Sequence, residues 1–222
     1  MVLFSLIAFV IMFGLFLTFE LRRNYLIALY FKGITSLTFI MLALSFLFQS
    51  GSLGPFALFI LIGLTFGLLG DIYLALRPLR EPKENETIII LGISVFSLGH
   101  ISYLIALSLL DQFSVLSICF GILMMFGVIL LSRLMKFQMG RTKYFNYAYA
   151  ALIFTMIGQS IVYVMNGGPV FLMLGACLFG VSDLVLAPIY YKQMNQKWMI
   201  ALNLITYYLA QVLIAASLYF FI

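Results

Sequence analysis

The sequence predicts an all-α membrane protein whose chain crosses the bilayer eight times. Two observations predict this fold class. Of the 222 residues, 65% are hydrophobic and only 9% are charged, with a mean hydropathy of +1.19, whereas a soluble domain carries roughly 25% charged residues. In addition, the apolar residues gather into eight separate runs that are each long enough to span a membrane.

Each run meets the length that a transmembrane helix requires, which is roughly 20 mostly apolar residues. Short stretches with charges or turn-forming residues separate the runs, and no connection is long enough to hold a soluble domain. We therefore expect residues 1–222 to form a single transmembrane domain. The predicted spans are residues 2–19, 25–48, 54–76, 88–110, 113–132, 144–165, 169–187 and 198–220.

Lysine and arginine residues are distributed unevenly between the connections. Of the 12 cations, 11 lie after spans one, three, five and seven, and the alternate connections carry none. Because positively charged loops stay in the cytoplasm, this pattern predicts four cytoplasmic loops and both termini on the other side of the membrane. The net charge of +5 follows the same rule, and we expect no nucleic-acid partner. In a bacterium the protein would lie in the inner membrane.

Ionisable side chains interrupt several of the apolar spans. Asp71 and Asp183 lie in spans three and seven, Lys32 lies in span two, and His100, the only histidine, lies in span four. With a rise of ~1.5 Å per helical residue, both aspartates and Lys32 fall in the cytoplasmic half of the bilayer, and His100 is deeper. Ionisable groups inside hydrocarbon mark functional sites by default. Span eight adds three polar residues on one helical face: Asn203, Tyr207 and Gln211.

Small residues precede both aspartates at helical spacing. Gly63 and Gly67 share one helix face with Asp71, and a similar run of small residues accompanies Asp183. Faces of this kind allow transmembrane helices to approach one another closely. We therefore expect both carboxyl groups to face the interior of the bundle rather than lipid.

The surroundings of the two aspartates resemble each other. Both occur in the pattern small–Asp–aliphatic–x–Leu–Ala, 112 residues apart, and near the same offset the segment around His100 resembles the segment around Gln211. Spans three and seven cross the membrane in the same direction. This similarity predicts two parallel four-span repeats, 1–110 and 111–222, with binding chemistry where the halves meet.

Two carboxyl groups in one membrane zone restrict the candidate functions. Desolvation and mutual repulsion favour one protonated and one ionised group, which suits general acid–base catalysis. The alternatives are a small proton-coupled transporter or exporter, with the carboxylates as relay groups, and a structural pair with Lys32. A metal site of Asp71, His100 and Asp183 conflicts with their different depths, since metal ligands lie within ~2.3 Å of one ion. We expect no metal and no cofactor.

The polar motifs, in this order and on these spans, resemble those of the YhhN family, which includes the vertebrate lysoplasmalogenases. The resemblance covers almost the whole chain. One departure is Gly33 after Lys32, where many members carry a proline, and this concerns the local shape of span two. The matching motifs are Lys32, Gly70-Asp71, Gly99-His100-x-x-Tyr103, Ser182-Asp183 and Tyr207-x-x-Ala-Gln211.

The resemblance implies an enzyme that hydrolyses the vinyl-ether bond of lysoplasmalogens to a fatty aldehyde and a glycerophospho-alcohol. It implies a lysophospholipid substrate within the lipid bilayer, with Asp71 and Asp183 as the acid–base pair. The sequence leaves open which aspartate donates the proton, which head group is preferred and which oligomeric state forms. Lys32 would contact the phosphate or tune one of the acids. Five further residues would orient the glycerol, the water or the ether oxygen: His100, Tyr103, Asn203, Tyr207 and Gln211.

Overall fold

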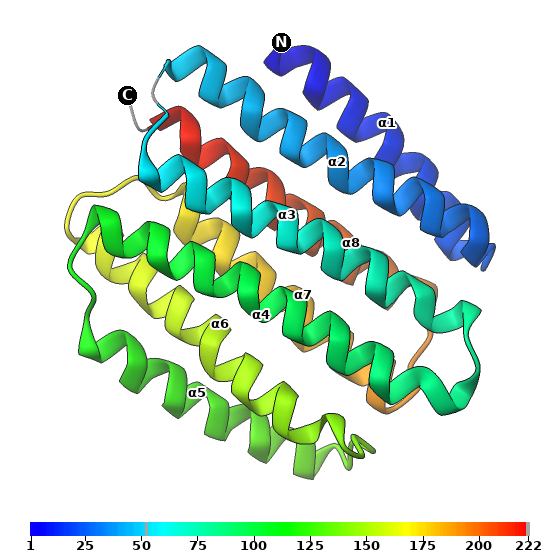
Figure 1. The fold of residues 1–222 in the computed structure, drawn as a ribbon. Helices are drawn as coiled ribbons and strands as arrows, with labels where there is room; N and C mark the ends of the chain where they lie inside the picture. The colour runs from blue at the N-terminus through cyan, green and yellow to red at the C-terminus, as the bar shows by residue number, and fades with distance from the viewer. Residues whose placement is uncertain (52, 221–222) are drawn as a thin grey trace.

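Eight long helices form the fold, and the part of the chain that the structure describes contains no strand (Figure 1). The computed structural model describes residues 1–51 and 53–220. Each of the eight helices is long and apolar enough to cross a membrane, which confirms the predicted fold class. They are α1 (Val2–Leu21), α2 (Tyr25–Ser50), α3 (Pro55–Leu76), α4 (Asn85–Leu110), α5 (Val115–Leu134), α6 (Thr142–Met165), α7 (Phe171–Tyr191) and α8 (Lys197–Ala216). Within the described residues three short 3₁₀ helices accompany them: η1 (Arg77–Leu79), η2 (Pro82–Glu84) and η3 (Ser217–Phe220).

The predicted spans agree with the helices to within a few residues, with one correction in α7. We expected Pro188 to end this helix, because proline has no N–H and clashes with the carbonyl group of the preceding turn. The helix instead continues through Pro188 to Tyr191, and the N–H of Lys192 donates to the Pro188 carbonyl oxygen over 3.0 Å. A proline lacks only its own N–H, so the helix loses one hydrogen bond there, while the residues after Pro188 keep theirs. The helix therefore extends three residues beyond Pro188.

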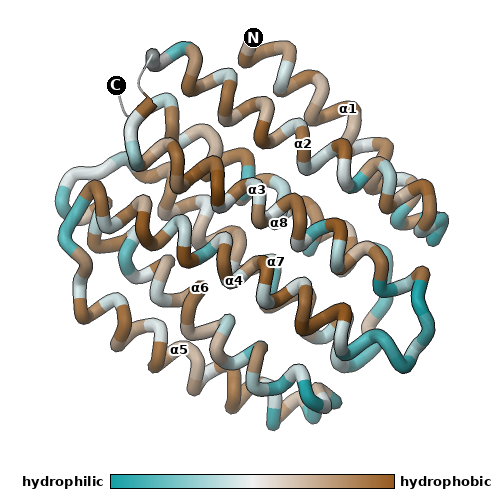
Figure 2. Tube along the Cα trace, in the orientation of Figure 1, coloured by the Kyte–Doolittle hydropathy of each residue, from teal (hydrophilic) through white to brown (hydrophobic). Residues whose placement is uncertain are grey.

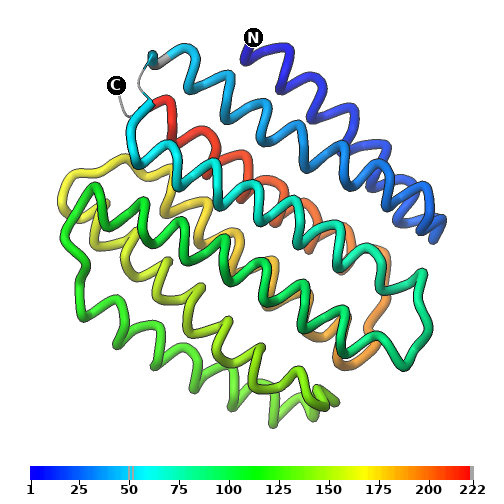
Figure 3. The backbone as a smooth tube through the Cα atoms, viewed as in Figure 1, coloured from blue at the N-terminus to red at the C-terminus, as the bar shows by residue number. Residues whose placement is uncertain are grey.

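The helices cross the bundle in alternating directions (Figure 3). Consecutive helices pack as the pairs α1–α2, α3–α4, α5–α6 and α7–α8; in addition, α2 packs against α3 and α8, and α4 packs against α6. The outer helices are α1 and α5, which bury few of their residues, whereas α3, α4, α6 and α8 bury whole faces. The interior surface of the bundle therefore comes mainly from the six remaining helices. Five of them, α2, α3, α4, α7 and α8, carry the polar residues singled out in the sequence.

The two ends of the bundle differ in the charge of their connections, although hydrophilic residues occur at both ends (Figure 2). The connections that carry lysine and arginine all lie at one end, which we call the charged end; they comprise residues 22–24, 77–84, 135–141 and 192–196. The start of α1 and the end of α8 lie at the opposite end (Figure 1). The loops with lysine and arginine are therefore gathered at one end of the bundle, as the positive-inside rule requires. The cytoplasmic location of this charged end stays a prediction.

The ends of α1 and α5 share one local geometry. Each helix is followed by a residue with a left-handed backbone, Arg23 with φ 59° and Lys136 with φ 55°. The next residue of each donates its N–H to the carbonyl oxygen five residues earlier, over 3.0 Å in both cases. This is the Schellman type of helix end, which many helices adopt. The likeness agrees with the two four-span repeats, which remain a prediction.

Candidate functional site

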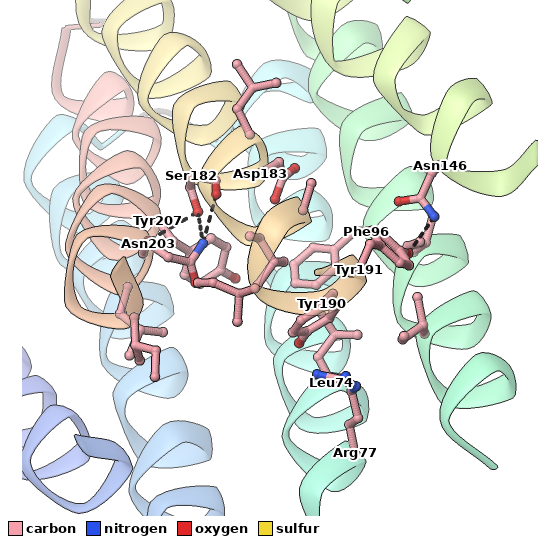
Figure 4. A pocket seen from close by; sticks show the side chains of 18 of the residues that line it. Leu74, Arg77, Phe96, Asn146, Ser182, Asp183, Tyr190, Tyr191, Asn203 and Tyr207 are labelled. Atoms are coloured by element: carbon pink, nitrogen blue, oxygen red, sulfur yellow. Dashed lines mark hydrogen bonds between the residues drawn. The ribbon is translucent and has the colours of Figure 1, made fainter. Parts of the chain in front are cut away.

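A cavity of about 440 Å³ lies between the helices and reaches the charged end (Figure 4). Its lining includes Arg23, Pro78 and Asn195 from the loops at that end, and both Asp71 and Asp183 from the interior. The two aspartates come from α3 and α7, which are far apart in the sequence. The fold therefore brings both predicted acids to the wall of one cavity.

Asp71 is surrounded by groups that stabilise a negative charge. Its side chain is only 2% exposed, and its Oδ1 lies 3.3 Å from Nζ of Lys32. Its Oδ2 accepts hydrogen bonds from the hydroxyl groups of Ser36, over 2.6 Å, and Tyr207, over 2.8 Å. An ionised carboxylate accepts hydrogen bonds and donates none, so these contacts fit the ionised form. Lys32 and Ser36 are one helical turn apart on α2, and together they face α3.

A chain of hydrogen bonds extends from Asp71 deeper into the bundle. Gln211 donates from Nε2 to the Tyr207 hydroxyl group over 3.0 Å, and the Tyr103 hydroxyl group donates to Oε1 of Gln211 over 3.1 Å. Every hydroxyl hydrogen in this chain therefore points toward Asp71. Tyr103 and Gln211 do not line the cavity; their hydrogen bonds reach Asp71 through Tyr207, and their role toward a substrate stays a prediction.

Two glycines of α3 create the room for this chain. A Cβ atom at Gly67 would lie 2.6 Å from Nε2 of Gln211, and a Cβ atom at Gly63 would collide with the Tyr103 ring. The small face that the sequence places beside Asp71 is thus the face on which the polar chain packs. The predicted orientation of Asp71, toward the interior, is confirmed by its burial.

In the part of the chain that the structure describes, the carboxyl group of Asp183 has fewer hydrogen-bond donors around it than that of Asp71, and no cation. Its polar neighbour is the hydroxyl group of Tyr149 on α6. Its Oδ2 is buried and has no hydrogen-bond partner, and among the described residues no cation comes within 4.0 Å of its carboxyl group. Burial of a carboxyl group without a cation or a set of donors disfavours the charged form. Both acids of the cavity are therefore desolvated, but only Asp71 has a cation and two hydroxyl donors beside it.

The residue before Asp183 fixes α7 against α8. Asn203 donates from Nδ2 to both the carbonyl oxygen and the hydroxyl group of Ser182, each over 2.9 Å, and Ser182 donates to the Asn203 carbonyl oxygen over 3.2 Å (Figure 4). Hydrogen bonds between transmembrane helices hold their relative rotation. This pair therefore sets the direction in which Asp183 points. Asn203 also lines the cavity.

His100 lies beside the cavity without lining it. Its Nδ1 is 2.8 Å from the carbonyl oxygen of Phe96; because a carbonyl group only accepts, Nδ1 carries the hydrogen and Nε2 is an acceptor. Nε2 is buried without a partner. The ring packs edge-on against Phe179 and Tyr149, with centroids 4.5 and 5.4 Å away. His100 thus supports two side chains that do line the cavity.

Sequence reasoning did not single out several residues of the site. Ser36 has a recognisable signal, since it lies four residues after Lys32 on the same helix face. Tyr149 and Tyr208 have none, because tyrosines are common in this chain, which has 13. Tyr208 is nevertheless buried, and its hydroxyl group lies 3.1 Å from Oγ of Ser36. The Ser36 hydroxyl group already donates its only hydrogen to Asp71, so Tyr208 is the donor in this contact.

Unpartnered polar atoms cluster at this cavity. Buried polar atoms almost always have hydrogen-bond partners within the protein or in bound molecules. Four side-chain atoms in the described part of the chain are buried without one, and three of them belong to residues that line the cavity: Arg77, Asn85 and Asp183. These atoms have no hydrogen-bond partner within the described protein and are left for water or a bound molecule, which is typical of a binding site. The same part of the chain holds no group of three or more His, Cys, Asp or Glu side chains placed to bind a metal ion.

Comparison with known sequences identifies the family. The profile of the YhhN family matches residues 27–218, a range that includes Lys32, both aspartates of the cavity and the whole polar chain to Gln211. Searches among curated proteins and among solved structures found no significant match. Since the match covers most of the chain, the protein belongs to the YhhN family.

Proposed function

We propose that this protein hydrolyses the vinyl-ether bond of a lysoplasmalogen, with Asp183 as the proton donor and Asp71 as the base. The observation that carries the proposal is the contrast between two carboxyl groups on one cavity. Asp71 is paired with a cation and accepts two hydroxyl donors, whereas Asp183 has an unpartnered buried oxygen. Carboxyl groups with opposite surroundings are the usual basis for separate acid and base roles at one site.

The hydrolysis of a vinyl ether requires one group that donates a proton and another that accepts one. Its cleavage begins when an acid protonates the carbon atom β to the oxygen, which leaves a positive charge shared between the α carbon and the oxygen. In our proposal Asp183 gives this proton, and the Asp71 carboxylate stabilises the cation and accepts a proton from the water that attacks the α carbon. Lys32 keeps Asp71 ionised until that step.

The second stage returns both acids to their starting forms. Attack by water produces a hemiacetal. Asp71 then passes its new proton to the ether oxygen of the glycerol, and Asp183 takes the proton of the hemiacetal hydroxyl group. The bond between the α carbon and the glycerol oxygen breaks, which gives a fatty aldehyde and a glycerophospho-alcohol. One water molecule is consumed, and no oxidant or reductant is needed.

The volume and lining of the cavity support a lipid substrate. Its volume of about 440 Å³ falls in the range of ordinary ligand pockets, roughly 300–1,000 Å³. Apolar side chains of α4 and α6 line much of it, among them Ile89, Ile93, Ile153 and Phe154. These side chains suit the alkenyl chain of the lipid, and the polar loops at the charged end suit its head group.

Mass spectrometry tests the proposal directly. A lysoplasmalogen incubated with the purified protein is expected to yield a fatty aldehyde and a glycerophospho-alcohol in equal amounts. In heavy water the aldehyde should carry one deuterium on the carbon next to the carbonyl group, because that carbon receives the proton from Asp183. Unchanged lipid would refute the hydrolase. Unchanged lipid that crosses the membrane of a reconstituted vesicle would identify a transporter instead.

A further inference from the structure

Arg77 is a cationic residue of the cavity without an anionic partner. It follows α3 directly, six residues after Asp71, which is about 9 Å along the helix axis toward the charged end. No acidic side chain in the described chain comes within 4.0 Å of its guanidinium group, and its Nε is buried without a hydrogen-bond partner. Lys32, in contrast, is already paired with Asp71. Arg77 therefore keeps an unpaired positive charge and an unpartnered Nε–H donor at the cavity wall.

Tyr190 holds the Arg77 guanidinium group in place. The centre of the guanidinium group lies 4.3 Å from the centre of the Tyr190 ring. Figure 4 shows the two side chains one above the other, below Asp183 in the view. A guanidinium group stacked on an aromatic ring keeps its N–H edge available, and that edge matches two oxygens of a carboxylate or phosphate.

Asn85 adds an acceptor to the same part of the molecule. It begins α4, lines the cavity together with Arg77, and has a buried Oδ1 without a partner. A carbonyl oxygen of this kind accepts from a hydroxyl or an ammonium group. A cation with free donors and a free acceptor thus line one cavity. Their combination matches a ligand that carries a phosphate beside a hydroxyl or amine.

The separation between the acids and Arg77 suits a lysophospholipid. Six covalent bonds join the vinyl α carbon to the phosphorus atom, and three extended bonds span ~3.8 Å, so the two atoms lie at most ~7.5 Å apart. Arg77 follows Asp71 by ~9 Å and Tyr190 follows Asp183 by ~10 Å along their helices. A lipid whose ether bond lies between the acids would therefore place its phosphate beside the N–H edge of Arg77.

From these contacts we propose that Arg77, stacked on Tyr190, binds the phosphate of the lysophospholipid and with Asn85 forms the head-group subsite of the cavity. The subsite rests on the proposed function for the identity of its ligand. Its consequence is selectivity: a lipid with a phosphate binds in preference to the same lipid without one. Basic pockets between transmembrane helices near a membrane surface bind phosphate head groups in this way.

Binding of lipids that the enzyme cannot cleave tests the subsite. The probes are a 1-alkyl lysophosphatidylethanolamine, whose saturated ether has no carbon to protonate, the matching 1-alkylglycerol, and inorganic phosphate. Each is titrated against purified wild type, Arg77→Gln and Arg80→Gln. Arg80 is the matched control, since it lies in the same loop but is exposed and outside the cavity lining. We expect wild type and Arg80→Gln to prefer the phospholipid at least about tenfold, the gain from hydrogen bonds to a charged group.

The preference should fall below about threefold in Arg77→Gln and take an intermediate value in Arg77→Lys, which keeps the charge but loses the two-pronged geometry. Arg77→Lys also provides the comparison if Arg77→Gln does not fold. An unchanged preference in Arg77→Gln would overturn the subsite. A second result would also overturn it: inorganic phosphate alone stabilises wild type in a way that depends on Arg77, while wild type shows no preference between the two lipids. The ligand of Arg77 would then be free phosphate. Since these probes are not cleaved, the result does not depend on whether vinyl ethers are hydrolysed.

Discussion

Removing the hydroxyl groups that donate to Asp71 tests the proposal that Asp71 is ionised. Ser36→Ala and Tyr207→Phe each delete one donor to Oδ2 and leave the rest of the side chain in place. A hydrogen bond to a charged group contributes roughly 1.5–3 kcal/mol, so we expect each change to slow aldehyde release by about tenfold or more. Steady-state kinetics in detergent will measure this. Thr35→Val is the matched control, because Thr35 is equally buried and its hydroxyl group bonds only within α2; equal losses in the control and Ser36→Ala would contradict the role of Ser36.

Tyr149 provides a comparable test for Asp183. Tyr149→Phe removes the hydroxyl group next to the carboxyl group of Asp183 and keeps the ring that packs on His100. We expect turnover to fall several-fold, since a proton donor held by one fewer contact is oriented less well, with little change in unfolding temperature. Tyr144→Phe, at an exposed position on the same helix, should have no effect. Equal turnover in wild type and Tyr149→Phe would show that Asp183 needs no support from α6.

At the level of the helices, close packing of α3 and α8 positions the polar chain. Gly67→Ala places a Cβ atom 2.6 Å from Nε2 of Gln211, so that Gln211 must give up its bond to Tyr207. We expect a marked loss of activity with a modest loss of stability, measured by aldehyde release and thermal unfolding on the same sample. At Gly14 on α1 nothing lies within 4 Å of an added Cβ atom, so Gly14→Ala should leave activity intact and favour the helix by about 1 kcal/mol. Similar activity in the two variants would contradict the packing argument.

The helices were predictable from the sequence because membrane spans follow from length and apolar composition, which are local properties. The end of α7 was not, since the effect of Pro188 depends on how many residues remain in the helix after it. The site was predictable where charge lies inside an apolar span, as for Lys32 and Asp71. Ser36 carries a signal only through its spacing from Lys32. The site was not predictable at Tyr149, because tyrosines are common in this chain, or at Arg77, because arginines are ordinary in a charged loop; their roles arise only when separate helices meet.

For the whole molecule, the orientation in the membrane is the prediction that most constrains how substrate enters. The uneven charge of the loops predicts that the charged end, where the cavity reaches the surface, faces the cytoplasm. Single cysteines at Arg80 and at Gln112, in a protein whose Cys119 and Cys177 are replaced, will report it. In intact cells or right-side-out vesicles a membrane-impermeant maleimide should label residue 112 at once, and residue 80 only after permeabilisation. The reverse pattern would invert the orientation.

The central claim is that Asp71 and Asp183 act as a pair on one substrate, and the rate of aldehyde release from aspartate variants tests it most directly. General acid and general base groups typically contribute factors of about 10²–10⁴. Asp71→Asn and Asp183→Asn should therefore each lower the rate at least about a hundredfold while the protein stays folded and monodisperse. Asp111→Asn, at a partly exposed loop position outside the cavity lining and at the end opposite the charged loops, should retain the wild-type rate. A folded Asp71→Asn or Asp183→Asn variant with near wild-type turnover would contradict the account.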